Sequence, residues 1–378
     1  MLLYMSNATT SELYDDLFKS GKVHFAYQMQ KFNHNIILGL SEFDEITALS
    51  ALPYVKNYKA KRIDQTIDKV HFVAVRNSIG KLHKPMNVFR LYKEGCKTIK
   101  KDKPKAILCD AIAKSPCVVS KILGKKFNIP VFAIVTDLPG LLGKDPDVQR
   151  GLERMKGFDG YVLLTEQMND LVNEDGKPYI VMEGLSSERT SGEKIEKREK
   201  TIVYAGSLWE KKAGIEYFVK GFLDANLEGH ELLLYGKGEL IPWIEQISLK
   251  NPTVKYMGCV PNDQVLDAQR RASLLINPRP SDEEFCKYSF PSKTIEYMLS
   301  GTPVLMTKLP GVPKEYFEHV YTIDEEDEVG VKKALIKIFS LTEQERLKFS
   351  MSAREFILNE KNIAKQSGKI HNFINQNI

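Results

Sequence analysis

The sequence predicts an α/β protein with two doubly wound, Rossmann-like domains that face a central cleft. The chain has 378 residues, which is about two and a half times a typical domain length. Short apolar or β-branched runs alternate with longer helix-period segments, as in parallel sheets that carry helices on both faces. A polar stretch at 186–200, with one apolar residue in fifteen, separates two such series and is typical of an exposed linker.

The alternation places a first domain at 1–190 and a second at 201–350. No strand follows the helical stretch at 351–378, so we expect this helix to cross back to the first domain. The strands expected in the first series are Leu2–Met5, Ile46–Leu49, Phe72–Val75, Ala106–Cys109, Val131–Thr136, Gly160–Leu164 and Tyr179–Met182. Those of the second series are Thr201–Ala205, Glu231–Tyr235, Val254–Met257, Leu274–Asn277, Pro303–Met306 and His319–Ile323. Helical segments include Val118–Phe127, Gly214–Phe222, Asn262–Arg271 and Thr294–Leu299.

The composition, 43% hydrophobic and 27% charged, excludes disorder, collagen and coiled coil. No apolar run reaches the length of a membrane span, and the first residues lack the features of a signal peptide. The five cysteines are odd in number and contain no C-x-x-C pair, so reduced thiols are expected. These features predict a cytoplasmic protein.

Positive charge is concentrated in one segment. Residues 56–150 carry 21 Lys and Arg against eight Asp and Glu, a net charge of +13, whereas the whole chain carries +5. This segment favours an anionic partner, namely an acidic membrane surface, a phosphorylated substrate or nucleic acid. For any single cluster of lysines, a solvated surface with no partner fits equally well. Nucleic acid is disfavoured because aromatic residues are not interleaved with the basic ones.

The stretch Leu274–Met306 carries the clearest chemical pattern: strand, polar loop, helix, Gly-centred turn and strand. Pro291 ends the extended segment and Ser292 is a good N-cap residue. The amides of the first helical turn, together with Lys293, predict a phosphate site. Glu296 lies one turn further, where a carboxylate can accept hydrogen bonds from ribose hydroxyls. The pattern suits a nucleotide diphosphate, and a plain helix start with a surface glutamate fits the spacing equally well.

A second phosphate-binding element is expected at 204–214, YAGSLWEKKAG. A strand runs into Gly206 and a turn of small residues, and Lys211 or Lys212 can reach an anion there. The motif is not a P-loop, because G-x-x-x-x-G-K-[ST] is absent.

Several motifs follow one another in a familiar order. Residues 296–304, EYMLSGTPV, fit the closing half of the pattern E-x7-E-A-M-A-x-G-x-P-V, and Gly206 and Lys212 keep the spacing of an opening strand-G-R-x-x-x-x-K-G. Gly236, the segment 258–261 and Asn277-Pro278 occupy the expected places between them. The second half thereby resembles the family 4 glycosyltransferases of the GT-B fold, closest to those of bacterial capsule and exopolysaccharide clusters. Residues 159–166 and 177–184 resemble the same polysaccharide subgroup, so the resemblance covers most of the chain.

The resemblance implies a glycosyltransferase that moves a sugar from a nucleotide-diphosphate sugar to a glycan or polyprenyl-diphosphate-linked acceptor in surface polysaccharide synthesis. It implies retention of anomeric configuration. A UDP-sugar is expected rather than a GDP- or dTDP-sugar, and no cofactor is expected. No metal is expected either, because lysines and helix dipoles can neutralise the leaving diphosphate. An Asp145–Asp147 D-x-D match lies in a loop and is interpreted as chance. The implied donor-binding residues are Gly206, Ser207, Lys212, Gly236, Gly258, Val260, Ser289, Phe290, Pro291, Ser292, Lys293 and Glu296.

Two departures from the family pattern bear on activity. Ser207 replaces its phosphate-binding arginine, and Tyr288 replaces the first glutamate of E-x7-E, which lies at the donor sugar in the family. We expect Glu284 or Glu283 to serve as the substitute acid. The departures also support an alternative, a non-catalytic glycosyltransferase-like subunit that acts as a partner or stabiliser.

In the first domain, Asp137 follows a strand at the edge expected to face the cleft and is a candidate catalytic residue. An aspartate that forms a turn before proline explains it equally well, and Asp110 has the same status. If the acceptor is lipid-linked, the basic segment 56–150 would hold the protein peripherally on the inner face of the membrane.

Overall fold

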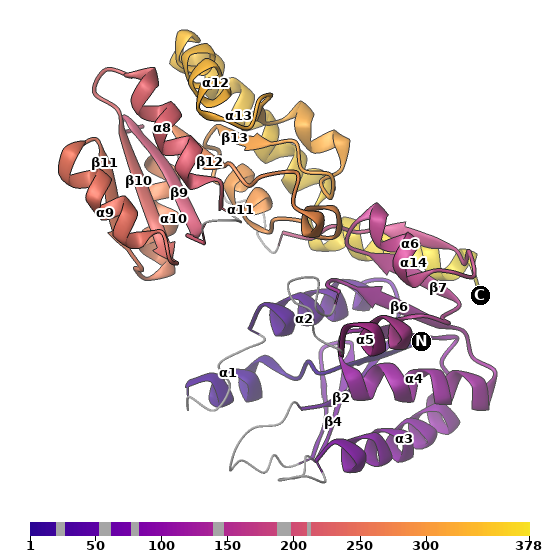
Figure 1. The fold of residues 1–378 in the computed structure, drawn as a ribbon. Coiled ribbons are helices and arrows are strands. Elements are labelled where there is room, and N and C mark those ends of the chain that lie inside the picture. The colour runs from indigo at the N-terminus through magenta and orange to yellow at the C-terminus, as the bar shows by residue number, and fades with distance from the viewer. Residues whose placement is uncertain (20–26, 53–61, 77–82, 139–146, 187–197, 210–212) are drawn as a thin grey trace. The chain divides into compact units, whose positions relative to one another are not determined.

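The computed structural model describes the chain except residues 20–26, 53–61, 77–82, 139–146, 187–197 and 210–212. The chain divides into two compact units. Unit 1 comprises Met1–Ser187 together with Ile363–Ile378, and unit 2 comprises Glu188–Asn362. Each unit is built around its own β-sheet with helices packed against it (Figure 1).

Unit 1 contains an eight-stranded sheet in the order β3-β4-β2-β1-β5-β6-β7-β8. Its strands pair in parallel except β3, which runs antiparallel to β4 at one edge. The central strands are buried along their whole length because helices cover both faces. The strands are β1 (Leu2–Ser6), β2 (Ile46–Ala51), β3 (Ile63–Ile67), β4 (Val70–Val75), β5 (Ala106–Asp110), β6 (Val131–Val135), β7 (Gly160–Leu163) and β8 (Tyr179–Val181).

The last helix of the chain completes the core of unit 1. It packs against α2, where Gly39 leaves room for Ser367. The Phe373 ring meets Phe132 of the sheet edge-on, with 5.6 Å between ring centroids. The helices of unit 1 are α1 (Ser11–Lys19), α2 (Tyr27–Ser41), α3 (His83–Asp102), α4 (Lys114–Phe127), α5 (Asp147–Met155), the 3₁₀ turn η1 (Glu166–Met168), α6 (Asn169–Val172) and α14 (Ile363–Gln376).

Unit 2 contains a six-stranded sheet in the order β11-β10-β9-β12-β13-β14, and all neighbouring strands are parallel. The strands are β9 (Thr201–Ser207), β10 (Glu231–Lys237), β11 (Val254–Gly258), β12 (Leu274–Asn277), β13 (Val304–Thr307) and β14 (Tyr321–Ile323).

Helices α8 and α12 of unit 2 pack together over one face of its sheet, where Ile202, Leu234, Ile276, Phe218 and Leu335 are buried in one core. The helices are α8 (Ile215–Ala225), α9 (Ile241–Lys250), α10 (Asn262–Arg271), η2 (Glu284–Tyr288), α11 (Lys293–Leu299), η3 (Lys314–Glu318), α12 (Glu328–Ser340) and α13 (Glu343–Glu360).

Each strand expected from the sequence is present, with bounds that differ by at most two residues. The exposed strand β3 was not expected. The helix expected at 351–378 is instead two helices: α13 packs on α11 within unit 2, which extends to Asn362, and α14 alone belongs to unit 1. All five cysteines are free thiols. No helix in the described part of the chain combines the length and apolar character needed to cross a bilayer.

Candidate functional site

The candidate site of unit 2 lies at the carboxyl ends of β9 and β12. Strand β9 pairs with β10 on one side and with β12 on the other, so the direction of winding reverses between β9 and β12. Ligands of doubly wound sheets bind outside the carboxyl ends of the strands at such a reversal. Gly206 and Ser207 end β9, whereas Pro278 and Arg279 directly follow β12. These two strand ends form the base of the site.

Two close backbone contacts at this edge require glycine. Gly236 lies opposite Gly206 in the β9–β10 register, and a Cβ atom on Gly236 would lie 1.8 Å from the Gly206 carbonyl oxygen. Gly214 precedes α8 with a φ of +64°, and its Cβ would lie 1.7 Å from the Pro278 carbonyl oxygen. Glycine therefore allows β10 and the start of α8 to close around the two strand ends.

Helix α11 is fixed to the end of β9 by a buried tyrosine. The Tyr297 hydroxyl accepts a hydrogen bond from the Ala205 N–H at 2.9 Å and donates to the Ala205 carbonyl at 3.2 Å. The helix follows Pro291 and Ser292 as predicted, but Ser292 does not cap it. Its φ and ψ of −53° and −26° are already helical, whereas a capping serine needs an extended backbone. The Thr294 N–H donates to the Pro291 carbonyl instead.

A carboxylate on α11 is held from two sides. Glu296 Oε1 accepts hydrogen bonds from Lys293 Nζ and from Gln269 Nε2, each at 2.8 Å. Gln269 is a fully buried residue of α10, whereas the Glu296 side chain is 31% exposed. Glu296 Oε2 has no hydrogen-bond donor among the described residues. The arrangement leaves an oriented carboxylate at the surface that can accept hydrogen bonds from a ligand.

The loop between β12 and α11 carries the acids predicted to replace the missing glutamate. Glu283 is half-buried and Glu284 is exposed. Burial raises the pKa of Cys286 to about 11, and the charge of Glu283 adds to this rise while that of Arg279 opposes it. Glu283 and Arg279 therefore lie on the same part of the loop. Tyr288, at the position of the missing acid, is half-buried.

The residues just before α11 hold this loop in place. Arg279 donates a hydrogen bond to Ser289 Oγ at 3.3 Å. The buried Phe290 ring packs against Tyr316, with 5.2 Å between centroids. Phe290 and Pro291 are buried, so they shape the loop.

Unit 1 has its own reversal of winding, between β1 and β5. Asp110 ends β5 there and is only 4% exposed. Its carboxylate accepts hydrogen bonds from the Ile112 N–H at 3.0 Å and from Asn33 Nδ2 at 3.1 Å, and Asn33 in turn accepts from the Tyr4 hydroxyl. Burial raises the pKa of Asp110 to about 6, although these hydrogen bonds oppose the rise. Asp110 is thus a polar group placed at the centre of the carboxyl edge of unit 1.

Asp137 follows β6, the next strand along from β5, and its side chain is exposed. Its Oδ1 accepts a hydrogen bond from the Leu138 N–H at 2.8 Å, as expected of an aspartate that forms a turn. The surrounding protein raises the pKa of Asp137 by partial desolvation. Asp137 is therefore at the predicted sheet edge.

The remaining predicted residues fall into two groups. Gly258 and Val260 lie at the end of the edge strand β11, on the same carboxyl edge as Gly206. Four further residues lie outside the described part of the chain, namely Lys211, Lys212, Asp145 and Pro146. Within the described ranges, no three His, Cys, Asp or Glu side chains are grouped as a metal site would require.

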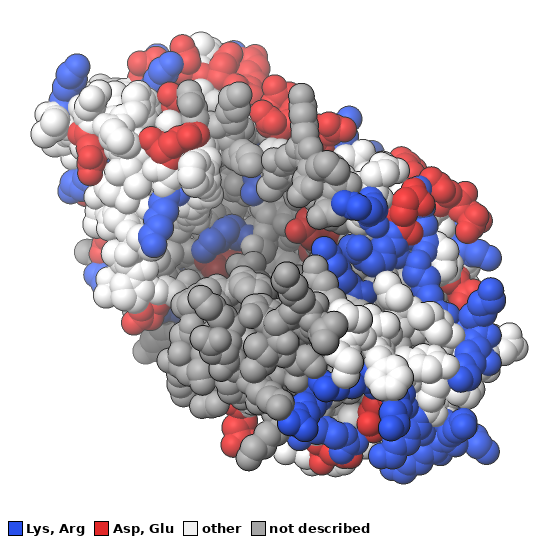
Figure 2. Space-filling view, turned by 60° about the horizontal axis from the view of Figure 1, so that its bottom comes forward, with Lys and Arg blue, Asp and Glu red and all other residues white. Residues whose placement is uncertain are grey.

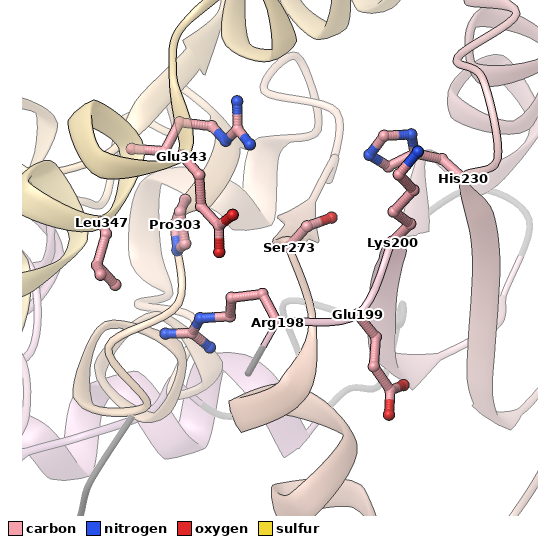
Figure 3. Close-up of a pocket in the computed structure, with 9 residues that line it drawn as sticks. Arg198, Glu199, Lys200, His230, Ser273, Pro303, Glu343 and Leu347 are labelled. Carbon is pink, nitrogen blue, oxygen red and sulfur yellow. The ribbon is translucent and has the colours of Figure 1, made fainter. Parts of the chain in front are cut away.

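A separate cavity of about 150 Å³ opens at the opposite edge of the unit 2 sheet (Figure 3). Its lining includes Lys200, Ser273 and Pro303, which directly precede β9, β12 and β13. Arg198 donates to the Gly301 carbonyl at 2.6 Å, which fixes the chain just before β9. This cavity faces the amino ends of the strands, so we do not place the candidate site there.

Sequence reasoning missed three residues of the site. Gln269 and Tyr297 orient Glu296 and α11, and Arg279 adds a positive charge at the end of β12. Arg279 stands directly after an expected strand, so its place at the carboxyl edge could have been read from the sequence. Nothing in the sequence pairs Gln269 with Glu296.

Residues 199–340 match the family described as glycosyl transferases group 1. This range covers all strands of unit 2 and the site at their carboxyl ends. This match, together with the fold, supports a glycosyltransferase with two Rossmann-like domains. No curated protein sequence matches the chain.

Solved structures of the same fold cover nearly the whole chain. A sucrose-phosphate synthase from Thermosynechococcus elongatus is similar with a TM-score of 0.63 at 11% identity, over 99% of this chain and 98% of that chain. HepE of Anabaena, in complex with UDP and glucose, has a TM-score of 0.60 at 14% identity, over 99% of both chains. An E. coli structure described as trehalose-6-phosphate bound with UDP-2-fluoro glucose has a TM-score of 0.67 at 11% identity, over 100% of this chain and 99% of that chain. These similarities confirm the predicted GT-B fold.

Proposed function

We propose that the protein transfers a sugar from a UDP-sugar to a glycan or lipid-linked saccharide in surface polysaccharide synthesis. One observation carries this proposal. Glu296 is oriented by Lys293 and Gln269 on a helix that Tyr297 fixes to the end of β9. A carboxylate held in this way can bind the two hydroxyls of a ribose while the neighbouring strand ends receive the diphosphate.

The proposed reaction breaks the bond between the anomeric carbon and the diphosphate oxygen, and the diphosphate leaves with the electron pair. The acceptor hydroxyl oxygen bonds to the anomeric carbon on the same face, and its proton passes to the departing phosphate. This route retains the configuration and needs no protein nucleophile. Stabilising the charge on the leaving diphosphate is the main task of the protein. We propose that cationic side chains at the carboxyl edge of unit 2 do this without a metal ion.

The base of the donor is inferred from two sources. The family resemblance implies a UDP-sugar, and HepE of Anabaena was solved with UDP and glucose. Isothermal titration with UDP, GDP and dTDP tests this proposal, and we expect UDP to bind at least tenfold more tightly than the other two. A panel of UDP-sugars, assayed for release of UDP, then identifies the sugar.

The same titration separates the enzyme from a non-catalytic subunit. Ser207 and Tyr288, at the two positions that depart from the family pattern, favour the subunit alternative. A subunit that has lost the site should bind none of the three nucleotides. Absence of binding to all three would refute the proposed transfer reaction.

Helices α3 and α4 support a membrane-bound acceptor. On each helix, exposed residues spaced four apart form a line along one face. The line on α3 is Phe89, Lys93, Lys97 and Lys101, and the line on α4 is Lys114, Val118, Ile122 and Lys126. The two helices pack together, because Gly95 lies against Leu123. Phe89 is 60% exposed and Ile122 is 44% exposed.

Figure 2 shows lysine and arginine gathered at the lower right, on the side of unit 1 that carries α3 and α4. Exposed apolar side chains among lysines are typical of a surface that binds anionic lipid headgroups. We therefore place a peripheral membrane contact on these two lines of residues. Each lysine near an anionic bilayer adds about 1 kcal/mol of attraction.

Vesicle sedimentation tests the membrane contact. We expect binding to vesicles that contain phosphatidylglycerol and none to pure phosphatidylcholine. Phe89→Asp combined with Ile122→Asp should lower binding at least tenfold. Leu249→Asp is the matched control, because Leu249 is 87% exposed on α9 of unit 2. Equal loss in both variants, or no loss in either, would refute the assignment to α3 and α4.

A further inference from the structure

Arg279 occupies the centre of the carboxyl edge of unit 2. Leu275 pairs with Val203 in the parallel register of β12 and β9. Strand β12 ends at Asn277, and a continuation of this register by four residues would set Arg279 level with Ser207 at the end of β9. The Arg279 carbonyl accepts a hydrogen bond from the Thr307 hydroxyl at the end of β13, which fixes its backbone between the ends of β12 and β13. The reversal of winding between β9 and β12 places this residue at the crevice where ligands of such sheets bind.

The Arg279 guanidinium is held without a carboxylate partner among the described residues. It donates a hydrogen bond to Ser289 Oγ at 3.3 Å and lies 5.4 Å from the centroid of the Phe285 ring. Two other cations at this edge are paired. Lys293 binds Glu296 at 2.8 Å, and Lys308 binds Asp324 at 3.1 Å. Arg279 therefore keeps donors available for an added anion.

The charge of Arg279 reaches the end of β9. Burial raises the pKa of Tyr204 to about 12, and Arg279 opposes this rise. The Tyr204 hydroxyl donates a hydrogen bond to the Ser207 carbonyl at 2.7 Å, so both residues belong to the same strand end. That strand end carries no charged side chain of its own among residues 201–209.

We infer that Arg279 binds the diphosphate of the nucleotide donor and supplies from β12 the positive charge that the end of β9 lacks. This inference deepens the proposed function and rests on it. A guanidinium suits the role because it stays charged at any working pH and can bind two phosphate oxygens at once. Ser289 and Phe285 fix the plane of the guanidinium, which reduces the ordering needed when the ligand binds.

Isothermal titration with UDP and with uridine tests the inference. We expect Arg279→Ala to weaken UDP binding at least tenfold and to leave uridine binding unchanged, because uridine lacks the diphosphate. Arg279→Lys keeps the charge but not the paired donors, so its affinity for UDP should fall between those of the wild type and the alanine variant. Lys308→Ala is the matched control at the same edge and should bind UDP like the wild type.

The pairing of β9 with β12 suggests a second variant for the same UDP titration. Ser207→Arg added to Arg279→Ala returns a guanidinium to the neighbouring strand end, and we expect it to recover at least part of the lost UDP affinity. No recovery would refute the claim that the two strand ends serve one diphosphate. Unchanged UDP affinity in Arg279→Ala would overturn the inference and leave the proposed function standing. A wild-type protein that binds no nucleotide diphosphate would refute the proposed function, and the inference with it.

Discussion

Replacing Glu296 by alanine tests the core of the proposed donor site. The carboxylate can accept two ribose hydrogen bonds, and a hydrogen bond to a charged group contributes about 1.5–3 kcal/mol. Two such bonds amount to at least about 3 kcal/mol, which corresponds to more than about a hundredfold in rate or affinity. We therefore expect Glu296→Ala to lower kcat/KM for the donor at least a hundredfold.

The fold should survive this substitution. The Lys293–Glu296 ion pair is about one-third exposed on both sides, and pairs of this kind contribute about 0–1 kcal/mol to stability. Thermal unfolding should therefore shift by only a few degrees. Glu296→Gln keeps one acceptor oxygen, so we expect it to lose about tenfold in kcat/KM.

Donor kinetics at saturating acceptor, together with UDP titration, provide the assay. Glu231→Ala is the matched control, because Glu231 is bound to Lys255 at 2.5 Å and is 39% exposed, but lies at the amino end of β10. This control should keep full activity. Full transfer and unchanged UDP affinity in Glu296→Ala would remove the ribose assignment.

Three further results are expected. Gln269→Ala removes the buried donor to Glu296, so KM for the donor should rise about tenfold while kcat changes little, and an unchanged KM would contradict its positioning role. Tyr297→Phe leaves the buried Ala205 N–H unpaired, so urea unfolding of unit 2 should show a loss of about 1–3 kcal/mol, whereas wild-type stability would contradict the link between α11 and β9. Asp110 has a raised pKa of about 6 in the folded state, so its protonation stabilises unit 1 at low pH. That stabilisation, about 3 kcal/mol, is complete below about pH 4 and is lost as the pH rises through 6. The difference in unfolding free energy between wild type and Asp110→Asn should therefore change over this range, and a constant difference would refute the buried ionisation.

The sheets could be predicted because their strands are continuous apolar runs. A parallel strand is covered on both faces, so runs such as Val131–Val135 contrast clearly with the helical periodicity around them. Strand β3 was missed for the opposite reason. Its sequence at Ile63–Ile67 is IDQTI, four of its five residues are exposed, and it pairs antiparallel at the sheet edge. Polar edge strands carry no periodic signal of burial.

The site was predictable only where its residues are close in sequence. Lys293 and Glu296 are three residues apart on one helix, so their proximity follows from helical spacing. Gln269 reaches Glu296 from another helix, 27 residues away, and only the fold of unit 2 brings the two side chains within hydrogen-bonding distance. Asp110 similarly depends on Asn33, 77 residues earlier in the chain. Contacts of this kind arise from the fold and leave no local pattern.

The place of α14 has a consequence for biosynthesis. Ile370, Phe373 and Ile374 of α14 are core residues of unit 1, yet they follow all of unit 2 in the sequence. A nascent chain that has emerged from the ribosome as far as residue 187 still lacks these side chains and exposes the apolar surface of β6 and α2 that they cover. Unit 2, which ends at Asn362, is synthesised completely before these residues. The amino-terminal half is therefore expected to mature last, and deletion of residues 363–378 should trap it in a protease-sensitive state while unit 2 folds normally.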